Sequence, residues 1–358
     1  MPCRTGYDEQ LLNQCSDSFA TVADIDGIVK EVSKFSIVVE NKDGSTRYID
    51  LTRRYGDSGD FHVPLDIITD FKVGDKVKQG DVIAYSPRWF TKDTMFKGKV
   101  AYKGYTLCKV ALMENSYTFE DSIAISKEFS NETTVDNTYI KQVIIDFEQG
   151  IHNIKTPGSE VSIDEPLCFI EDSLTNDAGM FDEESINLLS NINKMSPKSP
   201  VNGIVDNIEV IYNGDTDDMS ESLLKLVNIT DKLLITKLKS TGKEAYTGDS
   251  SDDVVSINGN RLMPETAVIT FYITSRNSIG TGDKIVVGSQ LKATIAKVFT
   301  EPPRLNKNDN TPGEVIDAIF STKSVNNRIV NSAYLQGITN RILVEGSKKV
   351  AELYFKNK

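Results

Sequence analysis

Residues Gly282–Lys292 read G-D-K-I-V-V-G-S-Q-L-K and follow a strand-like run over Glu265–Ser275. Lys284 and Lys292 lie eight residues apart and flank a loop that contains a glycine. A lysine side chain is a mobile point charge that suits a phosphate, so two lysines on one loop can hold neighbouring phosphates of a polynucleotide or a triphosphate. The alternative is that both lysines are solvated surface residues. A second stretch of the sequence bears on this choice.

The second stretch, Gly104–Ile123, reads G-Y-T-L-C-K-V-A-L-M-E-N-S-Y-T-F-E-D-S-I. Together the two stretches resemble the β subunit of multisubunit RNA polymerases. That family carries the run G-x-N-x-x-V-A-x-M-x-x-x-G-Y-N-F-E-D-S-I and, downstream, G-D-K followed by N-K-G. The residues in register here are Val110, Ala111, Met113, Tyr117, Phe119, Glu120, Asp121, Ser122 and Ile123, then Gly282, Asp283, Lys284 and Lys292.

Two weaker matches follow in the family's order. The arginine of the family's P-S-R-M-N looks like Arg328 in V-N-N-R-I. Order and approximate spacing are kept over roughly residues 5–335. The stretch around Glu120 or the stretch around Lys284 alone is suggestive, whereas the whole set of matches in this order is specific. The family's T-P-x-D-I-V run resembles Thr311, Pro312, Glu314, Val315 and Ile316.

The composition limits the class of protein. A length of 358 residues suffices for two or three domains with hydrophobic cores. A net charge of −12 argues against nonspecific binding of nucleic acid over the whole surface but leaves room for a local basic channel. We find no signal peptide or transmembrane run, so we expect a protein of the cytoplasm of a bacterial host cell, with the virion as the other location considered. The cysteines and histidines show no zinc-ligand spacing and suit a reducing compartment: Cys3, Cys15, Cys108, Cys168, His62 and His152.

The first third of the chain is predicted to be β. Phe35–Glu40 and Thr46–Leu51 are alternating runs joined through an Asp-Gly pair, which is a strong hairpin signal. Phe71–Ala84 then carries a G-D-x-V-x-x-G-D pattern, which is typical of sandwich-hybrid barrels, including lipoyl-type carriers. A carrier needs its modified lysine at a hairpin tip, whereas Lys76 and Lys78 fall inside a predicted strand.

Residues from about 146 to 264 differ in character. Residues 156–193 contain nine acidic residues and no basic one, which predicts a solvated face or, alternatively, a surface for a protein partner. Helices are predicted at Asp182–Asn193 and Glu221–Lys239, and a moderately helical segment at Val344–Phe355. On the second helix, four apolar side chains share a face that is predicted to be core, with contact to a partner as the alternative: Leu223, Val227, Leu234 and Leu238.

The resemblance implies a mainly β fold with an α+β insertion. Its core would be a double-psi β-barrel closed by the segments around 95–130 and 272–330, with a flap domain inserted between them and a sandwich-hybrid or hairpin β region before it. The chain is then expected to have four parts: a β-rich hybrid-binding region with the first part of the barrel (1–145), a flap-like insertion (146–264), the second part of the barrel with the lysine loop (265–330) and a C-terminal helical tail (331–358).

The acidic pair Glu120 and Asp121 is a candidate for chemistry. On a strand, adjacent side chains point to opposite faces, so one of the pair would face the active centre while the other bonds locally. The resemblance places the pair beside a second Mg²⁺ and the incoming nucleotide. The alternative is an exposed acidic pair at the end of a strand. The neighbouring Phe119 and Ile123 are expected in the core.

The resemblance places Lys284 and Lys292 near the RNA 3′ end, where they would neutralise backbone phosphates so that the 3′ hydroxyl and the triphosphate can approach. Arg328 would reach the substrate triphosphate because its planar fork suits phosphate oxygens, with an ordinary salt bridge as the alternative. The sequence departs from the family at Leu291 and Ala293, where glycines are usual, so the backbone path around the second lysine is left open.

Phosphoryl transfer by two metal ions needs carboxylates for Mg²⁺ and cations for the triphosphate. In the family the tightly held Mg²⁺ is bound by three aspartates in an N-A-D-F-D-G-D loop of the β′ subunit. Ala23–Gly27 reads A-D-I-D-G but lacks the third aspartate and the asparagine, so it is predicted to be a turn. The resemblance therefore implies that Mg²⁺ is the cofactor, that a partner mainly holds it, and that this chain alone is inactive.

These matches predict a subunit of a multisubunit DNA-directed RNA polymerase, a nucleotidyltransferase of transcription. The family's N-terminal half and C-terminal clamp have no match here, so we expect one piece of a split β subunit, most like those of large tailed phages. The expected partners are a β′-like subunit, a polypeptide with the remaining β regions, DNA template, RNA transcript and nucleoside triphosphates, with a promoter-specificity factor at the flap and no membrane. The alternative is a non-catalytic assembly or nucleic-acid-binding protein derived from such a subunit.

Overall fold

The computed structural model describes residues 7–93, 96–171, 196–251, 255–257, 259–288, 290–306 and 312–356. Within these residues the protein is mainly β, as the sequence predicted. Packing divides it into two compact units, each assembled from segments that are distant in the sequence. The first unit contains Lys103–Val135 and Asn277–Lys358, and the second unit contains Tyr7–Tyr102 and Asp136–Arg276. The predicted helix at Asp182–Asn193 lies outside the described residues.

The second unit contains an antiparallel sheet in the order β4-β3-β2-β7. β3 (Ser36–Asn41) and β4 (Thr46–Asp50) form the predicted hairpin. Gly44 adopts the left-handed conformation, with φ at 84°, that favours glycine in the connecting turn. Ile37 and Val39 belong to the apolar cluster on which this sheet closes. The other two strands are β2 (Gly27–Val32) and β7 (Lys76–Val77).

Two short antiparallel ladders, β1–β8 and β9–β10, lie in the same unit. Together with helix α1 (Tyr7–Gln14) they enclose a separate apolar cluster that includes Leu12, Tyr85 and Phe90. The strands are β1 (Ala20–Val22), β8 (Val82–Tyr85), β9 (Phe90–Lys92) and β10 (Val100–Tyr102).

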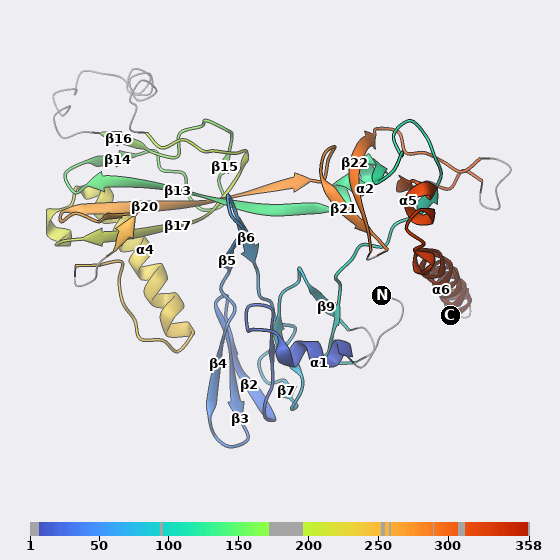
Figure 1. Cartoon of the computed structure of the whole chain (residues 1–358). Helices are drawn as coiled ribbons and strands as arrows, with labels where there is room; N and C mark the ends of the chain where they lie inside the picture. Colours follow the sequence, from blue (N-terminus) through green and yellow to red (C-terminus); the bar gives the residue numbers. More distant parts are fainter. Residues whose placement is uncertain are drawn as a thin grey trace. The chain divides into compact units, whose positions relative to one another are not determined.

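The largest sheet has the strand order β15-β17-β20-β13-β6-β5. Its long strands β17 (Gly203–Asn213), β20 (Thr266–Ser278) and β13 (Thr134–Asp146) lie side by side in Figure 1. β20 confirms the strand predicted at Glu265–Ser275, and its side chain Phe271 is fully buried in the largest apolar cluster. The short strands are β5 (Arg54–Asp57), β6 (His62–Leu65) and β15 (Glu160–Val161).

Helix α4 (Glu221–Ser240) packs against β17 and confirms the helix predicted there. Its N-terminus is capped by Ser220, whose side chain accepts a hydrogen bond from the backbone N–H of Leu223. The predicted apolar face is core: Leu223, Val227 and Leu238 are buried and Leu234 is half-buried. The helix also packs on β14 (Gly150–His152), which pairs with β16 (Phe169–Glu171). The remaining short elements of this unit are the paired strands β18 (Ser256–Ile257) and β19 (Asn260–Arg261) and a 3₁₀ turn at Thr216–Asp218.

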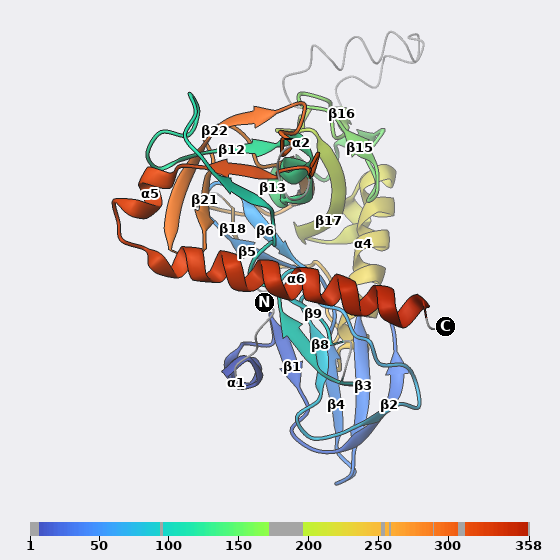
Figure 2. The same cartoon turned by 90° about the vertical axis from the view of Figure 1, so that its right-hand side faces the viewer.

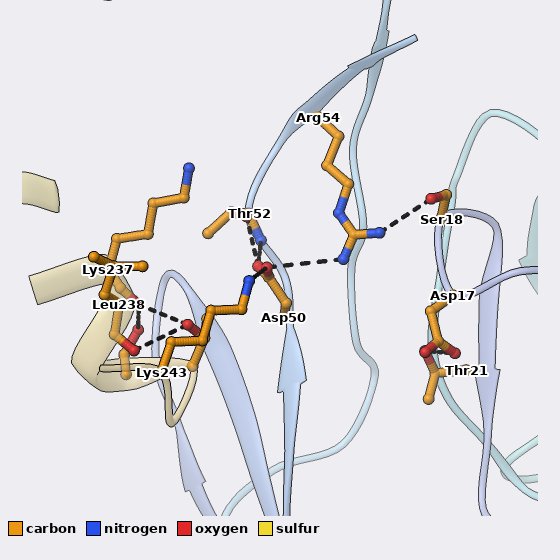
Figure 3. A network of polar contacts seen from close by, with 11 residues as sticks. Asp17, Ser18, Thr21, Asp50, Thr52, Arg54, Lys237, Leu238 and Lys243 are labelled. Atoms are coloured by element: carbon orange, nitrogen blue, oxygen red, sulfur yellow. Dashed lines mark hydrogen bonds and ion pairs between the residues drawn. The ribbon is translucent and has the colours of Figure 1, made fainter. Parts of the chain in front are cut away.

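A polar network joins the end of β4 to the segment that follows α4 (Figure 3). The carboxylate of Asp50 accepts hydrogen bonds from the backbone N–H and the hydroxyl of Thr52, at 2.8 and 2.5 Å. Arg54 and Lys243 bring their cations within 3.8 and 3.6 Å of the same carboxylate. Burial raises the pKa of Asp50, but the hydrogen bonds and the two cations outweigh it and hold the pKa below its ordinary value.

The first unit is built on a mixed five-stranded sheet in the order β11-β23-β12-β22-β21. β11 pairs with β23 and β12 with β22 in parallel, whereas β12–β23 and β21–β22 are antiparallel. Both segments of the unit contribute strands, so neither segment forms this sheet alone. The strands are β11 (Val110–Leu112), β12 (Ser122–Ser126), β21 (Lys284–Val287), β22 (Leu291–Phe299) and β23 (Ala318–Phe320).

Two short helices pack on the core of this sheet. Helix α2 (Lys127–Glu132) contributes Phe129, and helix α5 (Thr322–Asn326) contributes Val325. Both helices begin with a serine whose hydroxyl accepts a backbone hydrogen bond, so their positions are fixed by caps as well as by apolar contact.

The C-terminal helix α6 (Asn331–Lys356) is longer than the segment predicted at Val344–Phe355 (Figure 2). Its first turn packs Tyr334 against the core of the first unit, and Arg341 donates hydrogen bonds to both carboxylate oxygens of Glu314, each at 3.1 Å. These tertiary contacts hold a stretch whose glycine and β-branched residues give it a low helix propensity. None of the helices in the described residues has the length and apolar character that crossing a membrane requires.

Gly248 stands where the fold excludes a side chain. Its N–H donates to Asp231 of α4 (2.8 Å), and a Cβ at this position would lie 2.3 Å from the carbonyl oxygen of Val210. We expect Gly248→Ala to lower the free energy of unfolding by about 1–3 kcal/mol, because a strand carbonyl cannot move aside locally. Chemical denaturation of the full chain measures this change. Gly56→Ala is the matched control, since its Cβ would meet Leu65 at an ordinary 3.5 Å, and equal losses in both variants would contradict the prediction.

Candidate functional site

The two candidate lysines lie on paired strands of a β-hairpin. Lys284 of β21 is opposite Thr294 of β22, and Lys292 of β22 is opposite Val286 of β21. The two lysines therefore flank a tip that includes Gly288, as the sequence indicated, but each of them lies on a strand and not on a loop. The side chains of cross-strand partners point to the same face of a sheet, so both lysines share one face, at diagonal positions about 7–8 Å apart.

The strand around Lys292 follows from the two apolar residues on either side of it. Leu291 and Ala293 are buried, with only 1% and 3% of their surfaces exposed, and both belong to the apolar core of the first unit. Lys292 between them is exposed. Alternating apolar and polar residues specify a half-buried strand, whereas glycines would weaken it. Lys292 therefore lies on a strand and points outward, which settles the backbone path that the sequence left open.

The acidic pair precedes β12 and does not lie on it. Asp121 has a positive φ of 52°, in the left-handed region, so the alternation of a strand does not apply to it. Both carboxylates instead accept hydrogen bonds from the residues that follow α5. Glu120 accepts from the side-chain amide of Asn327 (3.3 Å), and Asp121 accepts from the guanidinium of Arg328 (2.5 Å). The strand alternation assumed for the pair therefore does not apply, and both carboxylates bond to the same segment after α5.

The backbone of Asp121 is held on both sides. Its N–H donates to the hydroxyl of Ser324 on α5, and its carbonyl accepts from the N–H of Thr294 on β22, both at 2.8 Å. Thr294 is in turn the cross-strand partner of Lys284. The sheet therefore brings the acidic pair, Arg328 and the lysine hairpin onto neighbouring elements of one unit, although Asp121 and Arg328 are 207 residues apart in the sequence.

Arg328 forms the ordinary salt bridge that was the alternative to a phosphate contact. The side chains of Arg328 and Asp121 are 46% and 51% exposed. An ion pair between side chains this exposed contributes about 0–1 kcal/mol, because water and salt screen it. The pair therefore orients Arg328 without holding it firmly.

Sequence reasoning missed Glu114, which fixes the start of α5. Its carboxylate accepts hydrogen bonds from the hydroxyls of Ser321 and Thr322, both at 2.8 Å, and from the backbone N–H of Lys323 at 3.0 Å. The hydrogen bond from the Lys323 N–H is the largest cause that lowers the pKa of Glu114. Burial acts in the opposite direction, but this bond and those from the two hydroxyls together outweigh it. No local pattern could reveal this role, because the partners lie more than 200 residues away along the chain.

Two neighbours of the acidic pair were expected in the core. Ile123 is buried, as predicted. Phe119 is 61% exposed, so the expectation is wrong for it. The ammonium of Lys323 lies 4.6 Å from the centre of the Phe119 ring, within the range of a cation–π contact. The loop before the acidic pair therefore presents aromatic surface outward.

The residues that the structure describes contain no group of three or more His, Cys, Asp or Glu side chains placed to hold a metal ion. Ala23–Gly27 includes the bend between β1 and β2, as predicted, and its aspartates are engaged: Asp24 with Arg47 (2.7 Å) and Asp26 with Lys42 (2.5 Å). The described carboxylates therefore do not fit the role of the principal Mg²⁺ ligands.

Comparison with known proteins gives one consistent similarity. The chain is similar to proteins named DNA-directed RNA polymerase subunit beta: 23% identical to that of Mesoplasma florum over 309 residues (82% of this chain, 22% of the relative), 24% to that of Spiroplasma citri over 313 residues (83% and 21%), and 24% to that of Alkaliphilus metalliredigens over 306 residues (82% and 22%). The chain spans about a fifth of the length of these curated relatives. No protein-family model matches the sequence.

The hydrogen bonds to Glu114 predict a pH dependence of stability. Because the folded pKa lies below the unfolded value of about 4.3, the ionised carboxylate stabilises the fold above that pH, and this contribution is lost as the pH falls through the folded pKa. We expect Glu114→Gln to destabilise the protein near neutral pH and to match the wild type more closely at about pH 3.

Urea denaturation at both pH values measures this difference. The control is Glu132→Gln, which alters an exposed carboxylate at the end of α2 that makes no hydrogen bond within the described part of the chain. A stability gap between the wild type and Glu114→Gln that stays constant from neutral to acid pH would refute the assigned role.

Proposed function

We propose that this chain is a β-type subunit of a multisubunit DNA-directed RNA polymerase and supplies cations to a centre that joins ribonucleotides. The similarity to named β subunits supports the family, and the ordered sequence motifs support the site. The observation that carries the proposal is the hydrogen bond from Thr294 N–H to Asp121 carbonyl. It links the segment of the acidic pair to the strand that pairs with Lys284.

The proposed role of Lys284 and Lys292 is electrostatic. Both lysines are exposed on one face of the hairpin, and neither makes an ion pair within the described residues. A growing RNA 3′ end and a triphosphate repel each other, so fixed positive charges beside them lower the cost of their approach. The lysine ammonium groups would hold backbone phosphates as point charges. Such contacts need a long side chain and a positive charge, but not the planar two-pronged geometry of a guanidinium.

Arg328 would exchange its ion pair with Asp121 for a contact with the triphosphate of the substrate. Its exposed ion pair with Asp121 contributes little to stability, so a ligand with several negative charges can compete for the guanidinium. Within the described residues, Glu120 accepts one long hydrogen bond, from Asn327 (3.3 Å). The resemblance would place this acidic pair beside a second Mg²⁺ and the incoming nucleotide.

The principal Mg²⁺ would be bound by a partner, because the described carboxylates of this chain form no suitable group. When bound, Mg²⁺ would stabilise the charge that develops on the phosphates. The chain alone is therefore proposed to be inactive. Its partners would be a β′-like subunit, a polypeptide with the remaining β regions, template DNA, RNA and nucleoside triphosphates, in the manner of the split subunits of large tailed phages.

The proposed fold assigns parts of the chain to this role. The five-stranded sheet of the first unit, with its two parallel pairs from distant segments, would belong to a double-psi β-barrel. Residues 146–264 would form a flap that a promoter-specificity factor contacts, and the β-rich part of 1–145 would lie beside the RNA–DNA hybrid. The C-terminal tail at 331–358 contains α6.

The alternative function is a non-catalytic assembly or nucleic-acid-binding protein derived from such a subunit. Purification from the native source separates the two functions. Recovery together with a polypeptide that carries a D-F-D-G-D motif supports the polymerase, whereas recovery as a lone monomer supports the alternative. Cross-linking between this chain and the co-purifying polypeptides identifies the partners.

Substitution of the hairpin lysines tests the proposed site. In the assembled complex, we expect Lys284→Ala and Lys292→Ala each to slow nucleotide addition by about tenfold or more, because a preorganised charge beside the transferring phosphate is lost. Lys284→Arg should retain more activity than Lys284→Ala, since it keeps the positive charge. Single-round transcription assays measure these rates.

The control is Lys349→Ala, which removes an exposed lysine of α6 that makes no ion pair within the described residues. This variant should transcribe at the wild-type rate. If Lys284→Ala and Lys292→Ala also transcribe at the wild-type rate, the two lysines do not belong to the site.

A further inference from the structure

A β-bulge in β22 places a third lysine on the face of Lys284 and Lys292. β12 pairs with β22 through Ile123↔Ile295 and then through Ala124↔Lys297, so one residue of β22 is left over. Without this extra residue, strict alternation would turn Lys297 to the core face that Ile295 occupies.

The burial of the neighbouring residues agrees with this register. Lys297 is exposed, whereas the next residue, Val298, packs against the apolar core of the first unit. The odd-numbered residues of β22 thus face the core before the bulge, and the even-numbered Val298 faces it afterwards. Lys297 consequently shares the outward face with Lys292 and Thr294.

Tyr117 lies over the end of this lysine row. The ammonium of Lys297 is 5.8 Å from the centre of the Tyr117 ring, and the ring also makes an edge contact with Phe299 at 6.1 Å. Tyr117 remains 43% exposed. An aromatic ring with accessible surface and an adjacent cation is the combination that binds a stacked base together with its phosphate.

The charges around the row favour an anion. Strands β21 and β22 contain three lysines and no acidic residue, in a chain whose net charge is −12. None of the three lysines makes an ion pair within the residues that the structure describes. The carboxylates nearby have hydrogen-bond partners of their own: Asp121 with Arg328, Glu120 with Asn327 at a long 3.3 Å, Glu114 with the start of α5, and Asp283 with the N–H of Gly280.

We propose that Lys284, Lys292, Lys297 and Tyr117 form one track for a single RNA strand, with phosphates along the lysines and a base stacked on Tyr117. This inference rests on the proposed function of the first two lysines and extends it to Lys297 and Tyr117. Three cations spread over two strands exceed what one phosphate group can contact, so the ligand is a strand and not a free phosphate. Because every base has a π-face, stacking on Tyr117 is tolerant of sequence.

Binding of a short, fluorescently labelled single-stranded RNA to the full chain tests the track. We expect Lys297→Ala to weaken binding and to reduce the slope of log affinity against log salt by about 0.7, the loss of one phosphate contact. Tyr117→Ala should weaken binding by about five- to a hundredfold, the effect of losing one stacked base, while Tyr117→Phe keeps most of the affinity. Lys349→Ala should bind as the wild type does.

The outcomes separate this inference from the proposed function. If Lys284→Ala and Lys292→Ala weaken binding while the Lys297 and Tyr117 variants do not, the extension of the track is wrong and the proposed site stands. Loss confined to Lys297 and Tyr117 supports RNA binding here and removes the other two lysines from the proposed function. Unchanged affinity in all variants overturns both. Displacement of the RNA by poly-glutamate of equal charge would show a site for acidic protein and overturn the track.

Discussion

The parallel pairing of β12 with β22 is the interaction on which the first unit depends. It aligns Ser122 with Thr294 and buries Ile123 against Ile295, and it joins two segments that are separated by most of the second unit in the sequence. Closing so long a loop costs entropy, although this cost grows only slowly with loop length. Burial of β-branched and aromatic side chains in one shared core, including Phe320, offsets the cost.

The same pairing controls the distribution of charge. Although the chain is acidic, two carboxylates near the hairpin already have partners: Glu114 caps α5, and Asp121 forms an ion pair with Arg328. The hairpin lysines, by contrast, have no ion-pair partner in the described residues. A positive surface therefore survives despite the net charge of −12. At physiological ionic strength its influence extends about 8 Å, so it acts on a bound strand and contributes little to long-range attraction.

Local patterns predicted much of the secondary structure because they reflect local physics. The Asp-Gly hairpin and helix α4 combine periodic apolar residues with a turn or a cap, whereas strand β20 is a largely continuous buried run, and all three were confirmed. The failures share a cause in distant contacts. The first half of α6 depends on Glu314 and on the core, and the exposure of Phe119 depends on Lys323, so neither could be deduced from nearby residues.

The sequence by itself determined a resemblance to the β subunits of multisubunit RNA polymerases, because the order and spacing of several motifs can be recognised at low identity. It also determined the first hairpin, through the alternating runs at Phe35–Glu40 and Thr46–Leu51 and the Asp-Gly pair between them. Only the tertiary structure decided that Arg328 pairs with Asp121 and that a bulge turns Lys297 outward. Those outcomes depend on strand register and on contacts between residues 207 positions apart, which no local periodicity encodes.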